Sequence, residues 1–193
     1  IILKRNGTVV APDGTFQYQT GNPSALLQYN FAGLLFASGE FPTNMAGNVQ
    51  ILGGTTMLLN GSKAVNGEFS VSGVLNCAGF TLSQNGLFTA NASAIVDING
   101  GSLALNGAVA FTAGSQFQDN SGGGGASLIV GGSGALTGEL LWQGGANALA
   151  NLTMNRAGAT LFIQTPLAIT GTLSLQQGFL HAPQIRIEST SLS

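Results

Sequence analysis

The sequence predicts an all-β fold, a right-handed parallel β-helix (β-solenoid) with coils of about 19–21 residues and an irregular N-terminal cap. Three observations predict this fold. Glycines that open alternating segments recur at coil length, five Asn-Gly steps lie between residues 60 and 107, and charged residues make up only 6% of the chain. Asn and Gly suit sharp turns, whereas the outer faces of helices need the long charged side chains that are scarce here.

The repeat is clearest at Gly67, Gly86 and Gly107, which are spaced by 19 and 21 residues. Each opens a segment in which apolar residues alternate, as in a half-buried strand. In a solenoid, equivalent residues of successive coils stack in columns inside the core. The two predicted columns are Phe69, Phe88 and Val109, and then Val71, Ala90 and Phe111. A fourth repeat is expected at Gly138, 31 residues further on, with the extra residues in the glycine-rich insertion 121–125.

The Asn-Gly steps predict the corners of the coils, because both residues tolerate positive φ. The same dipeptide between alternating strands is also the strongest hairpin signal, so an antiparallel fold is the competing prediction. The solenoid is favoured because the steps recur at coil length and because hairpins give no reason for internal columns.

The last third of the chain carries a more specific pattern. Asn-Leu-Thr-x-Asn at residues 151–155 precedes a short apolar strand, and Leu-x-Ile-x-Gly-Thr-Leu-x-Leu-x-x-Gly follows at residues 167–178. This pattern resembles the β-solenoid repeats of large secreted and surface (adhesin-like) proteins of Bacteroidetes-type bacteria. The resemblance covers about residues 147–182 well and residues 49–146 only in style. It implies an extracellular or cell-surface location and a repeat type, but no activity.

Residues 1–48 show no repeat. Strands are expected at residues 8–10 and 15–19, around a Pro-Asp-Gly turn. We interpret residues 1–48 as an N-terminal cap or assembly segment and residues 49–193 as the solenoid, within one structural domain, because an open solenoid end exposes core side chains and strand edges. The first residues match neither an initiator Met nor a signal peptide, so we expect a mature or excised piece of a longer protein.

Composition excludes several classes of function. The net charge is −2 with five Lys and Arg, which argues against nucleic-acid binding and against a polybasic membrane surface. No apolar run is long enough for a spanning helix, so no membrane insertion is expected. Cys77 is the single cysteine. It cannot form an internal disulfide, and its apolar surroundings predict burial.

Candidate catalytic residues are few. Asp97 and Asp119 are 22 residues apart, so stacking of coils brings them close, either as the dyad of a polysaccharide hydrolase or as a calcium site. Solvated turn acids are the favoured interpretation. A lyase also needs a basic residue, and Lys63 is the only one between residues 6 and 155. The single histidine, His181, has no supporting motif and is expected at the surface. No cofactor, metal or catalytic set is therefore assigned, and the chain is not expected to be an enzyme.

Two binding functions remain open. Trp142 is the only tryptophan and is a possible sugar platform beside Asp97 and Asp119, although burial is favoured. Ice binding needs aligned hydroxyls on a flat face, and the sequence shows no Thr-x-Thr at coil spacing. The leading prediction is a structural or adhesive module of a secreted or cell-surface bacterial protein, whose role is mechanical spacing, adhesion or head-to-tail self-association into a fibre, with surface glycans as possible partners. The alternatives are a polysaccharide-binding or polysaccharide-degrading β-helix protein and an ice-binding protein.

Overall fold

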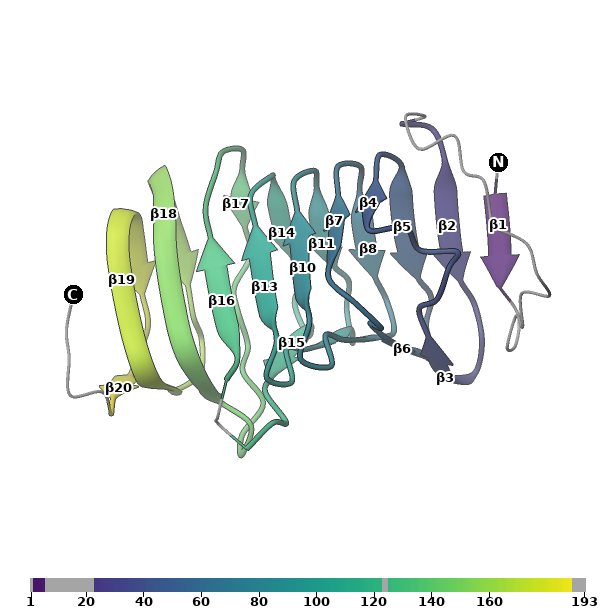
Figure 1. The fold of residues 1–193 in the computed structure, drawn as a ribbon. Coiled ribbons are helices and arrows are strands. Elements are labelled where there is room, and N and C mark those ends of the chain that lie inside the picture. Colours follow the sequence, from purple (N-terminus) through teal and green to yellow (C-terminus); the bar gives the residue numbers. More distant parts are fainter. Residues whose placement is uncertain (1, 6–22, 123–124, 189–193) are drawn as a thin grey trace.

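The fold is an elongated stack of β-strands, with β1 at one end and β20 at the other (Figure 1). The structure is a computed structural model that describes residues 2–5, 23–122 and 125–188. No helix occurs in these ranges, and the paired strands run parallel. The predicted parallel β-solenoid is thus confirmed, and the competing antiparallel prediction is wrong.

The described strands form three sheets. Sheet A contains, in spatial order, β1 (Ile2–Arg5), β2 (Leu26–Tyr29), β5 (Asn48–Ile51), β8 (Phe69–Val71), β11 (Phe88–Ala90), β14 (Val109–Phe111) and β17 (Leu136–Thr137). Sheet B contains β3 (Gly33–Phe36), β6 (Thr55–Leu58), β9 (Val74–Asn76), β12 (Ile95–Asp97) and β15 (Gln116–Gln118). Sheet C contains β4 (Asn44–Met45), β7 (Lys63–Val65), β10 (Thr81–Gln84), β13 (Ser102–Leu105), β16 (Ser127–Val130), β18 (Ala148–Phe162), β19 (Leu167–His181) and β20 (Ile185–Ile187).

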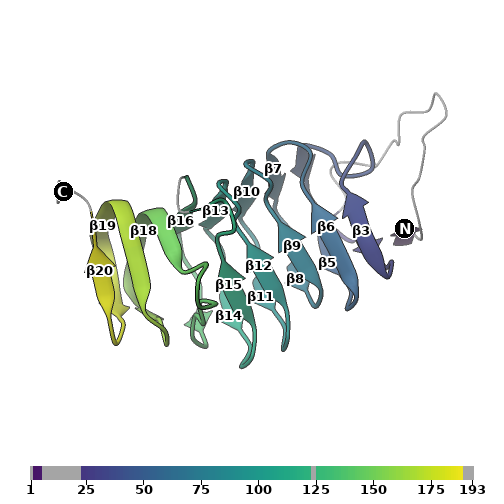
Figure 2. The same ribbon diagram turned by 90° about the horizontal axis from the view of Figure 1, so that it is seen from below.

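From β2 to β16, each turn of the chain visits sheet A, then B, then C, and so returns to sheet A one coil further along the rod (Figures 1 and 2). This order explains why the strands are only three or four residues long over most of the chain. It also places corresponding corners of successive turns in rows along the rod. The last three strands, β18, β19 and β20, all belong to sheet C.

The core consists of stacked apolar columns, as predicted. Phe88 pairs with Phe69 on one side and Val109 on the other, and Ala90 pairs likewise with Val71 and Phe111. All six are buried, and the rings of Phe69 and Phe88 stack with centroids 6.1 Å apart. A leucine column in sheet C runs parallel to these and consists of Leu82, Leu103, Leu128, Leu152 and Leu173.

The fourth repeat begins at Gly134, and the expectation of Gly138 is wrong. Val109 pairs with Leu136, 27 residues on, which makes Gly134 the equivalent of Gly107. Two turns lengthen in this coil, the one between β15 and β16 and the one between β16 and β17. The sequence prediction placed all the extra residues in the first of these turns, and that assignment shifted the register.

The Asn-Gly steps serve two physical roles. Asn99 and Gly100 have φ values of 43° and 71°, as predicted for a sharp corner. Gly107 is needed for a different reason, because a Cβ there would lie 2.0 Å from the carbonyl oxygen of Gly86 in the neighbouring coil. The asparagines that precede such glycines form an amide ladder, in which Asn106 donates to Asn85 (3.0 Å) and Asn85 to Asn66 (2.9 Å).

Strand pairing continues across residue 48 without interruption. β2, β3 and β4 form a complete coil that pairs in register with β5, β6 and β7. β1 adds one further strand to sheet A by pairing with β2. The strands expected at residues 8–10 and 15–19 lie outside the described residues, as do residues 123 and 124 of the glycine-rich insertion.

Candidate functional site

The corner between sheets B and C collects most of the polar side chains that the sequence singled out. Asp97 ends β12, where its Cα partners are Asn76 on β9 and Gln118 on β15. Its carboxylate accepts hydrogen bonds from the Gln118 amide (3.1 Å) and the Asn120 amide (2.8 Å), and also from the Asn120 backbone N–H (3.3 Å). Asp97 is 3% exposed, so its carboxylate interacts with these donors inside the corner and not with solvent.

Asp119 lies in the next coil, directly after β15. Its Oδ1 accepts hydrogen bonds from the backbone N–H groups of Gly100 and Ser121, both at 3.0 Å. Its own N–H donates to the carbonyl of Ala146 at 2.8 Å. The residue is 3% exposed, and its Oδ2 is buried with no hydrogen-bond partner among the described residues.

The two aspartates therefore lie at one corner but not in one column. The register pairs Asp97 with Gln118, which offsets Asp119 by one residue. A glycosidase needs two carboxyl groups that flank a bound sugar. Here one carboxylate is occupied by amide donors and both are buried, so the geometry stabilises the corner and offers no open dyad. The favoured expectation of solvated turn acids is therefore wrong.

Trp142 is buried, at 2% exposed, and cannot stack on a sugar ring in this structure. It pairs with Phe117 through an isolated parallel bridge. The rings form a short aromatic series, with centroid separations of 5.2 Å from Phe111 to Phe117 and 5.9 Å from Phe117 to Trp142. The favoured interpretation, a buried Trp142, is thus confirmed, and Trp142 is a core residue of the longer coil instead of a sugar platform.

Sequence reasoning missed a polar cluster around Glu40 and Lys63. Both side chains are buried. Lys63 Nζ donates to the Phe41 carbonyl and lies 5.2 Å from the centroid of the Phe41 ring. Burial lowers the pKa of Lys63, and the Glu40 carboxylate opposes that shift. The available signal was that Glu40 and Lys63, two of the few charged residues, are separated by close to one coil length. The ammonium group of Lys63 stabilises the first coil through its hydrogen bond to Phe41.

Sheet C presents a row of short polar side chains to solvent. Its outward column consists of Thr81, Ser102, Ser127, Asn151 and Thr172. Thr153 and Ser174 continue a second outward column on β18 and β19. The rows do not appear as a Thr-x-Thr repeat in the sequence, because they mix Ser, Thr and Asn.

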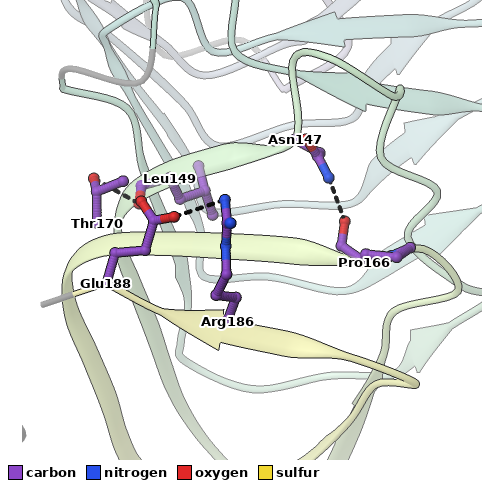
Figure 3. A network of polar contacts seen from close by, with 6 residues as sticks. All are labelled: Asn147, Leu149, Pro166, Thr170, Arg186 and Glu188. Atoms are coloured by element: carbon purple, nitrogen blue, oxygen red, sulfur yellow. Dashed lines mark hydrogen bonds and ion pairs between the residues drawn. The ribbon is translucent and has the colours of Figure 1, made fainter.

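The C-terminal coil is held by a small polar network (Figure 3). Asn147 Nδ2 donates to the Pro166 carbonyl (2.8 Å), Thr170 donates to the Leu149 carbonyl (3.3 Å), and Arg186 pairs with Glu188 (2.6 Å). Arg186 also lines a hollow of about 230 Å³ with Asn147 and Pro166. The Arg186–Glu188 pair is well exposed, so it contributes little to stability.

The remaining candidates are placed as the sequence predicted. Cys77 is fully buried, and desolvation, with Asp97 as a second cause, raises the pKa of its thiol to about 12. The thiol is therefore neutral and unreactive at physiological pH. His181 is exposed and contacts the edge of Phe162, with ring centroids 5.3 Å apart.

Comparison of the chain with protein-family models, curated proteins and solved structures finds no significant match. The resemblance to Bacteroidetes-type solenoid repeats stays a prediction. In the part of the chain that the structure describes, no helix has the length and apolarity that crossing a bilayer requires.

Proposed function

We propose that this chain is a rigid structural module of a secreted or cell-surface protein, and that it associates end to end through its C-terminal coil. Three parallel sheets give hydrogen bonding between backbones along the whole rod. The exterior carries mainly short neutral side chains, and only 6% of residues are charged. Low surface charge removes one ordinary barrier to association.

The observation that carries this proposal is the uncovered core at the C-terminal end. Met154 is buried, but Leu175, its Cα partner in the next coil, is 53% exposed. Phe179 is 68% exposed on the same coil. β20 covers β19 only at its first three residues, Leu167 to Ile169, so within the described ranges the rest of β19 has no strand beyond it.

The other end supplies a complementary surface. β1 is the outermost described strand of sheet A and pairs there with β2 alone. Within the described ranges the other edge of β1 pairs with no strand, and such an edge accepts another strand by β-augmentation. Contact between the two different ends of successive copies is heterologous, so it generates an open filament instead of a closed ring.

Sedimentation velocity and negative-stain electron microscopy test the proposal. The wild-type protein should form elongated oligomers that grow with concentration. Phe179→Glu places a charge at the exposed end and should weaken association at least about tenfold. Phe80→Glu is the matched control, because Phe80 is partly exposed on the side of the rod, and it should leave association unchanged. A wild-type protein that stays monomeric at every concentration contradicts the proposal.

A second candidate function, ice binding, is favoured by the outward rows of sheet C. Parallel strands hold equivalent residues about 4.8 Å apart, which gives a regular array of short polar groups. The test is thermal hysteresis of the purified protein. Ser102→Lys should abolish any hysteresis, whereas Thr89→Lys on the outer face of sheet A should not. Absence of hysteresis in the wild type rejects this candidate.

A further inference from the structure

A hollow of about 300 Å³ lies where the longer coil departs from the regular ones. On one side is the turn after β15, with Asp119, Asn120 and Gly122, and on the other is the segment that leads into β18, with Gly145 to Asn147. The N–H of Asp119 donates to the Ala146 carbonyl, so the two sides are already in contact. The hollow is therefore a defined feature between two adjacent coils.

Among the described residues that line this hollow, Asp119 is the one ionisable residue. Two backbone N–H groups fix its Oδ1 and so hold the carboxylate in place. Its Oδ2 is buried and has no hydrogen-bond partner in the described ranges. A buried carboxylate oxygen without a donor or cation is costly, so such groups ordinarily mark an ion or an ordered water.

The charges around the hollow favour a cation. No lysine, arginine or histidine occurs among the described residues that line it. A second acid, Asp97, accepts a hydrogen bond from the side-chain amide of Asn120, which lines the hollow. Asn147 Nδ2 donates to Pro166, which turns the amide oxygen of Asn147 away from that carbonyl (Figure 3).

We propose that Asp119 and the turns that face it form a calcium site. Ca²⁺ accepts carboxylate, amide and backbone carbonyl oxygens in flexible geometry, and all three kinds occur here. A single carboxylate implies weak binding, with a dissociation constant of about 0.1–1 mM, as in extracellular modules. The bound ion neutralises Asp119 and ties residues 119–122 to residues 145–148. The site does not depend on end-to-end association.

Isothermal titration of the whole chain with CaCl₂, after treatment with a chelator, tests the site. TbCl₃ gives an independent reading, because Trp142 is the only tryptophan and lies three residues before Gly145. We expect Tb³⁺ luminescence excited through Trp142, with Ca²⁺ as a competitor. At about 10 mM, Ca²⁺ should raise the Tm by about 3–10 °C. No binding of either ion overturns the proposal.

The variants separate a cation site from a purely structural role. Asp119→Asn retains an acceptor for the Gly100 and Ser121 N–H groups but removes the charge, so affinity for Ca²⁺ should fall at least about tenfold. Glu68→Gln makes the same charge change at an exposed position and should bind as the wild type does. If Asp119→Asn lowers the Tm equally with and without CaCl₂, the carboxylate is structural and the proposal is wrong. Asn147→Ala, which leaves the buried carboxylate intact, should weaken binding several-fold.

Discussion

The regular coils, residues 63–118, and the longer coil that follows them, residues 119–163, both stack parallel strands around an apolar core. They differ in which contacts stabilise that stack. In the regular coils, paired residues such as Phe69 and Phe88 are 19–21 positions apart. In the longer coil the separations grow to 27 for Val109 and Leu136 and to 24 for Leu128 and Leu152. The additional residues of the longer coil lie in two turns, between β15 and β16 and between β16 and β17.

The regular coils rest on many equivalent contacts. Each core column, each Asn rung and each close glycine approach occurs again one coil later, so no single contact is unique. Repeat proteins of this kind gain stability from nearest-neighbour interfaces that add along the rod. The loss of one contact weakens one interface and leaves the others intact.

The longer coil rests on one side chain, Arg156. This residue is 1% exposed and donates from β18 to carbonyls at equivalent corners of the two preceding coils. Its acceptors are Leu105, Gly107, Gly131, Gly134 and Ala135. Burial lowers the pKa of the guanidinium. The two regions therefore differ in how they are stabilised. In the regular coils many equivalent contacts each contribute, whereas in the longer coil the buried guanidinium of Arg156 contributes most.

The largest expected effect is therefore that of Arg156→Met. Removal of the guanidinium leaves several buried carbonyls without donors, which should destabilise the longer coil by about 4–5 kcal/mol. Urea unfolding followed by circular dichroism should then show an early transition that the wild type lacks. Arg186→Met is the matched control, because Arg186 is exposed and its ion pair among the described residues is the one with Glu188. Equal curves for the two variants would contradict the role of Arg156.

Phe88→Ala should have the next largest effect, about 3–4 kcal/mol, because it leaves a cavity in a buried column. The loss should appear in the main unfolding transition, since Phe88 belongs to the regular coils. Phe80→Ala removes a partly exposed ring from the same region and should cost much less. A loss similar to that of Phe80→Ala would mean that neighbouring rings close the cavity.

Gly107→Ala should cost about 2 kcal/mol. The new Cβ would lie 2.0 Å from the Gly86 carbonyl oxygen, so adjacent coils must separate locally. Gly61→Ala makes the same change at a corner where no atom lies within 4 Å of the added Cβ, and it should be nearly neutral. Thermal unfolding of the pair measures the difference, and identical midpoints would show that the coils yield without strain.

The regular region was predictable from the sequence to the level of individual columns, because a fixed period carries the register from Phe69 to Phe88 and Val109. The longer coil was not, since the sequence of residues 119–147 shows neither how many residues are extra nor which turn takes them: the expected spacing was 31 residues and the observed one is 27. Arg156 and Lys63 escaped prediction for a related reason. Their acceptors are backbone carbonyls, which leave no mark in the sequence.

The smallest effect concerns Cys77 and depends on pH. Its pKa in the folded chain is raised from 9.0 to about 12, so the thiol stays neutral where the unfolded chain has already ionised. Above pH 9 the Cys77 thiol loses its proton only in the unfolded chain, and this ionisation favours the unfolded state. Stability should therefore fall as pH rises above 9, by up to about 1.4 kcal/mol per pH unit more than in Cys77→Ala, with parallel behaviour of the two proteins near pH 7. Urea unfolding at several alkaline pH values measures this difference. Because Cys77 lies in the regular coils, the extra loss should persist in an Arg156→Met background. If the extra loss appears in the early transition of that variant and not in the main one, the regular coils unfold together with the longer coil, and the two regions are not energetically distinct.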